Sequence, residues 1–253
     1  MKLGLHIGYS GAHYEVPVEL VQKAEKLGYS SVWTAEAYGT DAMTPLAFLA
    51  AKTERIKLGT AIIQLAARTP ANAAMQAATI DTMAGGDRFI TGIGVSGPQI
   101  VEGWYGQPWG RPYYRIKDYV AIMRKVWKRE APVEHQGEEI SLPFTGEGAL
   151  GVGKPPVILH MGQFADLPRH RQRGDRQAHG EIADGGCRWV RAGLPARIPA
   201  ELEEGFRRAG SSKSLKNFEI RLPPMWRSTT TIQEALDKLK PGRPLRRRHG
   251  PQG

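Results

Sequence analysis

The first 130 residues alternate strand-like and helix-like patterns four times, and this repetition constrains the fold more than any other feature. The expected strands cover residues 2–9, 30–36, 56–64 and 88–95. Alternating apolar and non-apolar residues mark the first strand: Leu3, Leu5 and Ile7 on one face, Gly4, His6 and Gly8 on the other. Because a helix at this spacing carries the chain back to the same end of the sheet, the pattern predicts parallel strands.

Helical patterns fill the gaps between the expected strands. The first has an apolar stripe, and Gly28 follows it as its predicted C-cap. The others are expected from about Thr44 to Glu54, from Pro70 to Gly85, and from Arg111 to Arg129. Proline at a helix start and glycine past its end are typical boundaries.

Such alternation fits an open doubly wound sheet or a closed (β/α)8 barrel. Small or polar residues on one face of the strands suit a crowded barrel lumen: Gly4, His6, Gly8, Gly92 and Gly94. Polar residues follow the carboxyl ends of the strands, where active sites of such barrels gather: Glu36, Gln64, Ser96 and Gln99. We therefore predict an α/β chain of the (β/α)8 TIM-barrel type.

The segment GIGVSG at residues 92–97 matches the dinucleotide-binding pattern G-x-G-x-x-G. A Rossmann fingerprint should follow the first strand and lead directly into a helix. Here the glycines lie within and after the fourth strand, and we expect the next helix only at Arg111. We therefore interpret Gly92 and Gly94 as lumen space and Gly97 as a place where a ligand approaches the backbone.

Cysteine content and apolar patterning indicate the compartment. The single cysteine, Cys187, excludes an internal disulfide and fits a reducing environment. We find no apolar run of about 18 residues and no signal-peptide pattern at the start. Histidine and cysteine spacings typical of metal sites are also absent from the sequence. We expect a cytoplasmic protein with no membrane span and no metal site.

The net charge of +10 is concentrated in the last third of the chain. Residues 1–165 hold 16 Lys+Arg and 15 Asp+Glu, whereas residues 166–253 hold 19 and 10. A basic segment can bind nucleic acid, but this one lacks interleaved aromatic residues and any known binding module. Nucleic-acid binding is therefore the third functional hypothesis, and we expect no nucleic-acid partner.

The run from VWTAEAYGTDAM through IKLGTAIIQLAARTPANAAM to RFITGIGVSGPQIVEGWYGQP resembles the luciferase-like monooxygenase superfamily. More narrowly, it is similar to actinobacterial oxidoreductases that use the deazaflavin coenzyme F420. The resemblance covers residues 1–168 and implies a (β/α)8 barrel, usually dimeric, with a reduced flavin or deazaflavin at the carboxyl rim. It implies hydride transfer between F420 and a small unsaturated or carbonyl substrate. The alternative cofactor is FMN, with oxygen activation.

The resemblance also implies roles for individual residues. Glu36 is expected to donate or accept a proton beside the substrate carbon. Residues of three rim segments are expected to contact the coenzyme: Glu36, Tyr38, Gly39, Asp41, Gln64, Leu65, Ser96, Gly97 and Gln99. The third strand is expected to bend near Gln64 and Leu65, often at a non-prolyl cis peptide. The expected substrate pocket comprises His13, Trp104 and Tyr105, with Trp109 beside them.

Each role has a structural alternative. Glu36 can form a salt bridge at the rim, and Gln64 can hydrogen-bond to neighbouring backbone. The aromatic residues can simply pack beneath their loop, and His13 can lie in solvent. We interpret His6 as a polar group of the core, because lumen histidines usually serve there.

The resemblance breaks after about Pro168. The segment RHRQRGDRQAHG at 169–180 shows no strand alternation, and family-like islands return only at 180–186, 202–210, 216–220 and 232–242. We interpret residues 169–253 as a degenerate, basic part of the same domain, produced by compensating reading-frame shifts; genuine divergence is the alternative. Residues 166–253 show no recognisable strand pattern, and we expect residues 169–180 to form no regular parallel strand, which leaves an incomplete barrel half with unpaired strand edges. The second functional hypothesis is thus an inactive, truncated or frameshifted relative.

Overall fold

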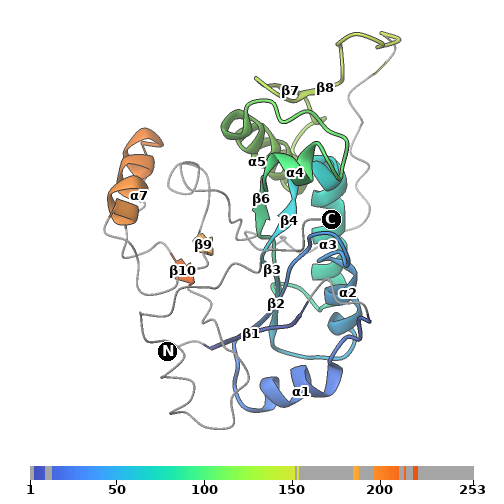
Figure 1. Cartoon of the computed structure of the whole chain (residues 1–253), viewed down its shortest axis with the longest axis vertical. Helices are drawn as coiled ribbons and strands as arrows, with labels where there is room; N and C mark the ends of the chain where they lie inside the picture. The colour runs from blue at the N-terminus through green and yellow to red at the C-terminus, as the bar shows by residue number, and fades with distance from the viewer. Residues whose placement is uncertain are drawn as a thin grey trace, which may run out of the picture.

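The computed structural model describes residues 3–8, 13–151, 153, 185–187, 197–210, 214 and 219–221 (Figure 1). The strands are β1 (Gly4–His6), β2 (Ser31–Thr34), β3 (Lys57–Thr60), β4 (Ile63–Gln64), β5 (Phe89–Ile90), β6 (Ile93–Gly94), β7 (His135–Gln136), β8 (Ser141–Leu142), β9 (Gly185–Cys187) and β10 (Glu219–Arg221). The helices are α1 (Val18–Lys26), α2 (Thr44–Ala50), the 3-10 turn η1 (Leu65–Ala67), α3 (Pro70–Met83), α4 (Pro98–Val101), α5 (Pro112–Lys128) and α7 (Arg197–Arg208).

The main sheet is parallel, with strands in the order β1-β2-β3-β5. Each strand therefore pairs with the strand of the next βα unit along the chain. A doubly wound sheet would instead reverse its order beside the first strand. The order is that of a (β/α)8 barrel wall, as predicted, and the described strands do not close into a complete barrel.

Two of the predicted strands are each divided into two. Residues 56–64 form β3 and β4, separated by a cis peptide bond between Ala61 and Ile62. The fourth strand divides into β5 and β6, and β6 pairs with β4. The cis peptide thus lies in the third strand, slightly before the position that the family resemblance implied.

Gly92 lies where the two divided strands touch. The Thr60 hydroxyl both accepts from Gly92 N and donates to Gly92 O, each at 2.8 Å. A Cβ atom on residue 92 would lie 2.0 Å from the Thr60 carbonyl oxygen. Glycine is required here because the neighbouring backbone, rather than a side chain, occupies the space.

The indole of Trp33 fills the face of the sheet opposite the helices. Its ring lies across β1 and β3, where a Cβ on Gly4 or Gly59 would approach it to 3.0 and 2.3 Å. Its Nε1 donates to Ser31 Oγ at 2.8 Å. The expected crowded lumen is therefore present, and one large aromatic residue occupies it between two glycines.

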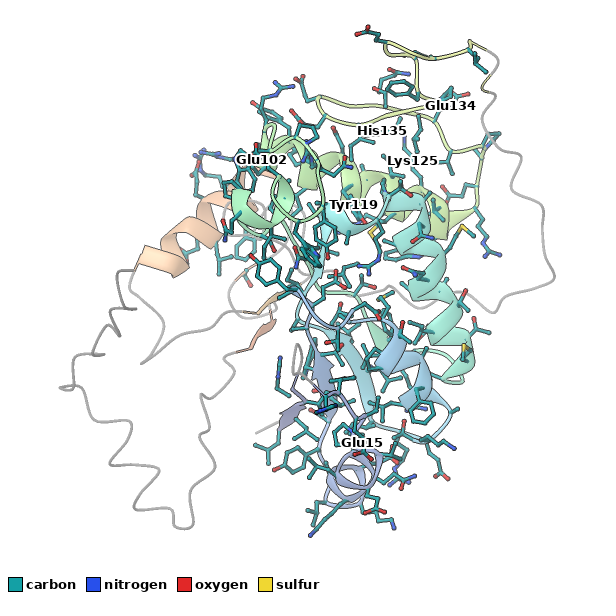
Figure 2. The ribbon with its side chains drawn as sticks, turned by 45° about the vertical axis from the view of Figure 1, so that its right-hand side comes forward. Glu15, Glu102, Tyr119, Lys125, Glu134 and His135 are labelled. Atoms are coloured by element: carbon teal, nitrogen blue, oxygen red, sulfur yellow. The ribbon has the colours of Figure 1, made fainter. Side chains whose placement is uncertain are left out.

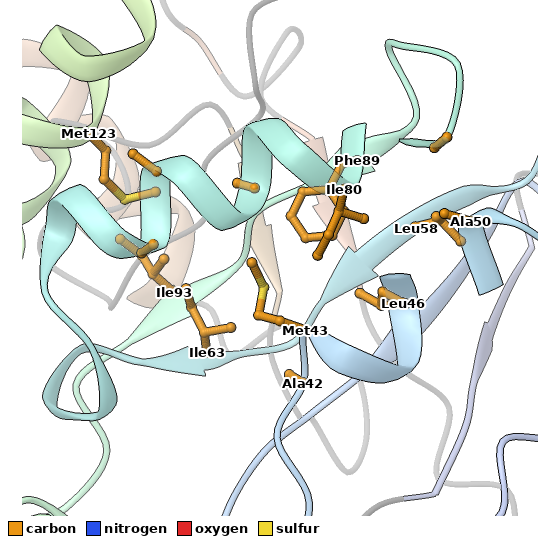
Figure 3. Packing of buried hydrophobic residues seen from close by; sticks show 14 of the residues in the cluster. Ala42, Met43, Leu46, Ala50, Leu58, Ile63, Ile80, Phe89, Ile93 and Met123 are labelled. Atoms are coloured by element: carbon orange, nitrogen blue, oxygen red, sulfur yellow. The ribbon is translucent and has the colours of Figure 1, made fainter. Parts of the chain in front are cut away.

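The other face of the sheet carries the hydrophobic core, covered by α2 and α3 on the same side of the strands (Figures 1 and 3). Leu46 of α2, Leu58 of β3 and Phe89 of β5 are all buried there. Each such side chain contributes roughly 1.5–3 kcal/mol through burial. α5 then packs on α3 with its own buried face, including Ile116 and Met123.

Glu25 of α1 holds the turn that leads into β3. Its carboxylate accepts hydrogen bonds from the backbone N–H groups of Glu54, Arg55 and Ile56, the last two at 2.6 and 2.7 Å. Burial raises the pKa of Glu25, but these hydrogen bonds outweigh it and hold the pKa below its ordinary value. The ionised carboxylate thus fixes the amino end of the third strand.

Two sequence-based expectations were wrong. A short helix, α4, begins at Pro98 directly after Gly97, well before Arg111, because the proline suits the first helical position. Strands also occur after residue 166, since β9 and β10 pair in parallel with α7 between them in sequence. Strand β9 escaped the pattern analysis because it is three residues long and starts with two glycines.

Helix α7 buries Leu202 and Phe206, which lie four residues apart on one helix face. The predictions for residues 169–180 lie outside the described residues. Among the described helices, none is long and apolar enough to cross a membrane.

Candidate active site at the carboxyl rim

Glu36 and Arg68 form a bidentate ion pair just beyond the ends of β2 and β4. Arg68 donates from its two terminal nitrogens to Glu36 Oε1 and Oε2, at 2.8 and 3.1 Å. Only 2% of the Glu36 side chain and 11% of the Arg68 side chain are exposed. Burial lowers the pKa of Arg68, but the hydrogen bonds and charge of Glu36 outweigh it and raise the pKa above its ordinary value.

The remaining capacity of the Glu36 carboxylate is also used. Oε1 accepts from Gln64 N at 2.6 Å and Oε2 accepts from Ala42 N at 3.0 Å. Both oxygens therefore receive two donors each, and a proton on either would displace one of them. This arrangement opposes the predicted role of Glu36 as a proton donor or acceptor and matches the alternative of a salt bridge at the rim.

The Gln64 side chain is buried and only partly satisfied. Its Nε2 donates to the Glu36 carbonyl oxygen at 3.0 Å, which fixes the orientation of the carboxamide. Its Oε1 has no donor among the described residues, although Gln64 is only 1% exposed. An unpaired buried acceptor costs about 1–3 kcal/mol, so this oxygen is suited to a donor from a bound molecule.

Tyr119 of α5, labelled in Figure 2, contacts the backbone at Arg68. Its hydroxyl lies 3.0 Å from the Arg68 carbonyl oxygen and 3.3 Å from that of Thr69, the N-cap of α3. Burial raises the pKa of Tyr119 far above its ordinary value, so the hydroxyl remains a donor. The ion pair is thereby tied to the helix layer behind it.

Aromatic side chains lie over this rim. Tyr38 and Trp104 contact each other edge to face, with ring centroids 5.6 Å apart. Both are more than half exposed, whereas Tyr105 is partly buried. Burial raises the pKa of Tyr105 above its ordinary value, and the nearby Glu36 charge adds to this effect. Tyr38, a predicted coenzyme contact, and Trp104, a predicted pocket residue, are thus brought together.

The segment after β6 has an unusual backbone. Ser96 has a left-handed φ of 62°, a conformation that is uncommon for residues other than glycine. The Gln99 side chain folds back over Gly97, so that a Cβ on Gly97 would lie 2.4 Å from Gln99 Oε1. Strained backbone of this kind is often found at ligand-binding loops.

Other predicted residues have structural functions. Asp41 caps α2, since its Oδ1 accepts from Met43 N and Thr44 N at 2.8 Å each. Leu65 is 5% exposed and belongs to the hydrophobic core, and Trp109 packs against that core. Leu65 therefore offers its side chain to the core and not to the rim.

Three more residues complete the placement of the predicted site. Gly39 is exposed in the loop after β2, and His13 is exposed in the loop before α1. His6 is partly buried on β1, where burial lowers the pKa of its ring. The described residues contain no cluster of His, Cys, Asp or Glu side chains that could hold a metal ion.

Comparison with known proteins shows the family of this chain. The family model for luciferase-like monooxygenases matches residues 2–247. The chain belongs to this family. The match includes residues beyond 168, where the sequence alone showed only islands of resemblance.

Individual members of the family are similar over much of the chain. A Mycobacterium tuberculosis protein named, provisionally, as a coenzyme F420-dependent oxidoreductase is 45% identical over 228 residues, or 87% of this chain and 65% of that protein. The 5,10-methylenetetrahydromethanopterin reductase of Archaeoglobus fulgidus is 31% identical over 163 residues, or 64% of this chain and 47% of that protein. The chain thus spans less than two thirds of these curated relatives.

A solved structure shows the same fold. The coenzyme F420-dependent tetrahydromethanopterin reductase from Methanopyrus kandleri superposes with a TM-score of 0.66 at 21% sequence identity. The match covers 87% of this chain and 65% of that one. The wall of parallel strands described above is therefore the luciferase-like barrel fold.

Sequence reasoning missed Arg68 and Tyr119 as members of the site. Arg68 lies between an apolar segment and the start of α3, and its partner Glu36 belongs to the preceding βα unit. The one local signal was a single charged residue among apolar neighbours, in QLAARTP. That signal indicates a need for a partner without identifying it.

Proposed function

We propose that this luciferase-like protein is an oxidoreductase that binds coenzyme F420 at the carboxyl rim and moves a hydride to or from a small organic substrate. The observation that carries the proposal is the 45% identity over 228 residues to a protein named as F420-dependent. The archaeal methylenetetrahydromethanopterin reductase supports the same reaction class. We further propose that the protein acts in the cytoplasm.

The rim residues fit such a coenzyme. A deazaflavin ring carries an imide N–H, and Gln64 Oε1 is a buried acceptor that lacks a donor among the described residues. Ser96 has a left-handed φ, and together with the adjoining Gly97 it would expose backbone beside the imide edge of the ring. These residues would hold the ring side of the coenzyme.

When bound, the coenzyme would supply or accept the hydride at a substrate carbon, and the proton would pass between the neighbouring substrate atom and solvent. The residues of this chain orient the reactants. Tyr38 and Trp104 offer an apolar cover that excludes water, and Gln64 holds the ring by its acceptor oxygen. Four donors engage the carboxylate of Glu36 and hold it in place, and Glu36 in turn fixes Gln64.

Equilibrium titration of the full chain tests the coenzyme assignment. Oxidised F420 should bind at least about tenfold more tightly than FMN, a difference of about 1.4 kcal/mol. Equal or reversed affinities would remove F420 from the proposal and leave FMN as the coenzyme. Tighter binding of NAD than of either would favour a dinucleotide site at GIGVSG instead.

A competing hypothesis is that reading-frame shifts in the C-terminal part leave the chain inactive. The concentration of basic residues after 165 supports it, because the rest of the chain is nearly neutral. Sequencing the gene again decides between the two. A corrected frame that restores a glycine-rich loop after Pro168 would identify this chain as an altered form of an active enzyme.

We also propose that the chain forms a homodimer through α2 and α3. Their outer surface exposes Phe48, Met75 and Met83, each about half or more. The one charged residue of α3, Asp81, is buried, so the exposed face of that helix is uncharged. In a two-fold dimer a surface meets its own copy, and the uncharged face of α3 does so without repulsion, while Lys52 lies over the Phe48 ring at the α2 side of this surface.

A further inference from the structure

A continuous set of hydrogen bonds connects α5 to the open acceptor on Gln64. The Tyr119 hydroxyl donates to the Arg68 carbonyl oxygen, the Arg68 guanidinium donates to the Glu36 carboxylate, and Gln64 Nε2 donates to the Glu36 carbonyl oxygen. Each of these side chains is largely or fully buried. The set ends at Gln64 Oε1, the atom that has no donor among the described residues.

We propose that Arg68 is a positioning residue that, through Glu36, holds the Gln64 carboxamide in the one orientation that presents Oε1 to the coenzyme. The identity of the incoming donor rests on the proposed function, whereas the holding of Gln64 is a property of the unliganded protein. Neither Arg68 nor Tyr119 was assigned a role by sequence reasoning.

The geometry explains why an arginine is needed. Its planar fork satisfies both oxygens of Glu36 at once, which leaves Gln64 Nε2 free to donate to the Glu36 backbone carbonyl. A buried carboxylate deprived of this fork would be short of donors. It would then recruit the Gln64 amide, and the carboxamide would leave the orientation that exposes Oε1.

The first test uses the full chain without coenzyme. The side-chain amide signal of Gln64, assigned by its loss in Gln64→Leu, is followed by nitrogen–proton NMR. We expect a dispersed signal in the unmodified chain and a signal at a different chemical shift in Arg68→Met, because the amide then donates to the Glu36 carboxylate instead of the Glu36 carbonyl oxygen. The control is Arg55→Met, because Arg55 is exposed and pairs with Glu54 away from the rim. An unchanged Gln64 signal in Arg68→Met would overturn the proposal.

Arg68→Met leaves a buried carboxylate unpaired, and that variant can fail to fold. The double variant Arg68→Met with Glu36→Gln removes the unpaired charge and restores folding. Its Gln64 signal should remain at the shifted position, since the fork is still missing and the side-chain oxygen of residue 36 is still short of donors. A Gln64 signal at the position of the unmodified chain in this folded double variant would show that the fork is not needed, and the proposal would fall.

The second test measures coupling through binding of oxidised F420. Gln64→Leu should weaken binding by about three- to tenfold, the worth of one hydrogen bond. Arg68→Met with Glu36→Gln should weaken it by a similar factor, and adding Gln64→Leu to this pair should cause no further loss. Multiplying losses would overturn the proposal. If the unmodified chain binds no F420, the proposed function fails, and the NMR test still decides the role of Arg68.

Discussion

Tyr38 and Trp104 contact each other edge to face at the carboxyl rim, with their ring planes at 86°. The two rings come from different βα units, and both are about half exposed. If they cover the coenzyme, binding of oxidised F420 should quench tryptophan fluorescence mainly through Trp104. We expect Trp104→Phe to remove most of the quenching. Trp127→Phe is the control, because its indole donates to Ala74 O between α5 and α3. Equal residual quenching in both variants would contradict the placement.

The contact between Trp33 and Gly59 predicts a large effect on stability. A methyl group on residue 59 would lie 2.3 Å from the indole, so Gly59→Ala should destabilise the chain by about 1–3 kcal/mol in chemical denaturation. Gly8→Ala is the matched control, since a Cβ there meets nothing within 4 Å. Adding Trp33→Phe to Gly59→Ala should recover part of the loss, because the smaller ring leaves space. No recovery would show that the overlap is relieved elsewhere.

Glu25 predicts a pH-dependent contribution to stability. Its folded-state pKa is lowered, so the stabilisation is complete above the ordinary pKa of 4.5 and is lost as pH falls through the lowered value. Glu25→Gln should cost about 1–3 kcal/mol at pH 7, and the difference from the unmodified chain should shrink below about pH 4. Unfolding free energies across this range are the measurement. Glu54→Gln, at an exposed residue with a long ion pair, should show little effect. A difference that stays constant with pH would refute the assignment.

The proposed dimer surface gives a prediction about association. Met75→Glu places a charge on the apolar face of α3, where a two-fold partner would present the same charge. We expect the mass measured by light scattering to fall from dimer to monomer. Thr82→Glu lies on an exposed part of the same helix near its end and should have a smaller effect. A monomeric unmodified chain would rule out the dimer directly.

Local patterns in the sequence determined most of the secondary structure of the first 130 residues and its parallel arrangement, with α4 and the division of the third and fourth strands as exceptions. Gly28 and Gly85 end α1 and α3 with φ values of 82° and 87°, as expected of residues without a Cβ. These features depend on neighbouring residues along the chain, so their periodicity and turn chemistry could be read directly. Membership of the luciferase-like family followed from runs of consecutive residues in the same way.

Only the tertiary structure decided how the rim residues are used. Glu36 was predicted to donate or accept a proton, but the fold places Arg68 against it, and the two are brought together by the register between β2 and its neighbours. The division of the third and fourth strands at Thr60 and Gly92 depends on the same packing. A glutamate looks the same in the sequence whether its carboxylate forms an ion pair or is free. Its partner is determined by which strands lie side by side, and local periodicity carries no information about that.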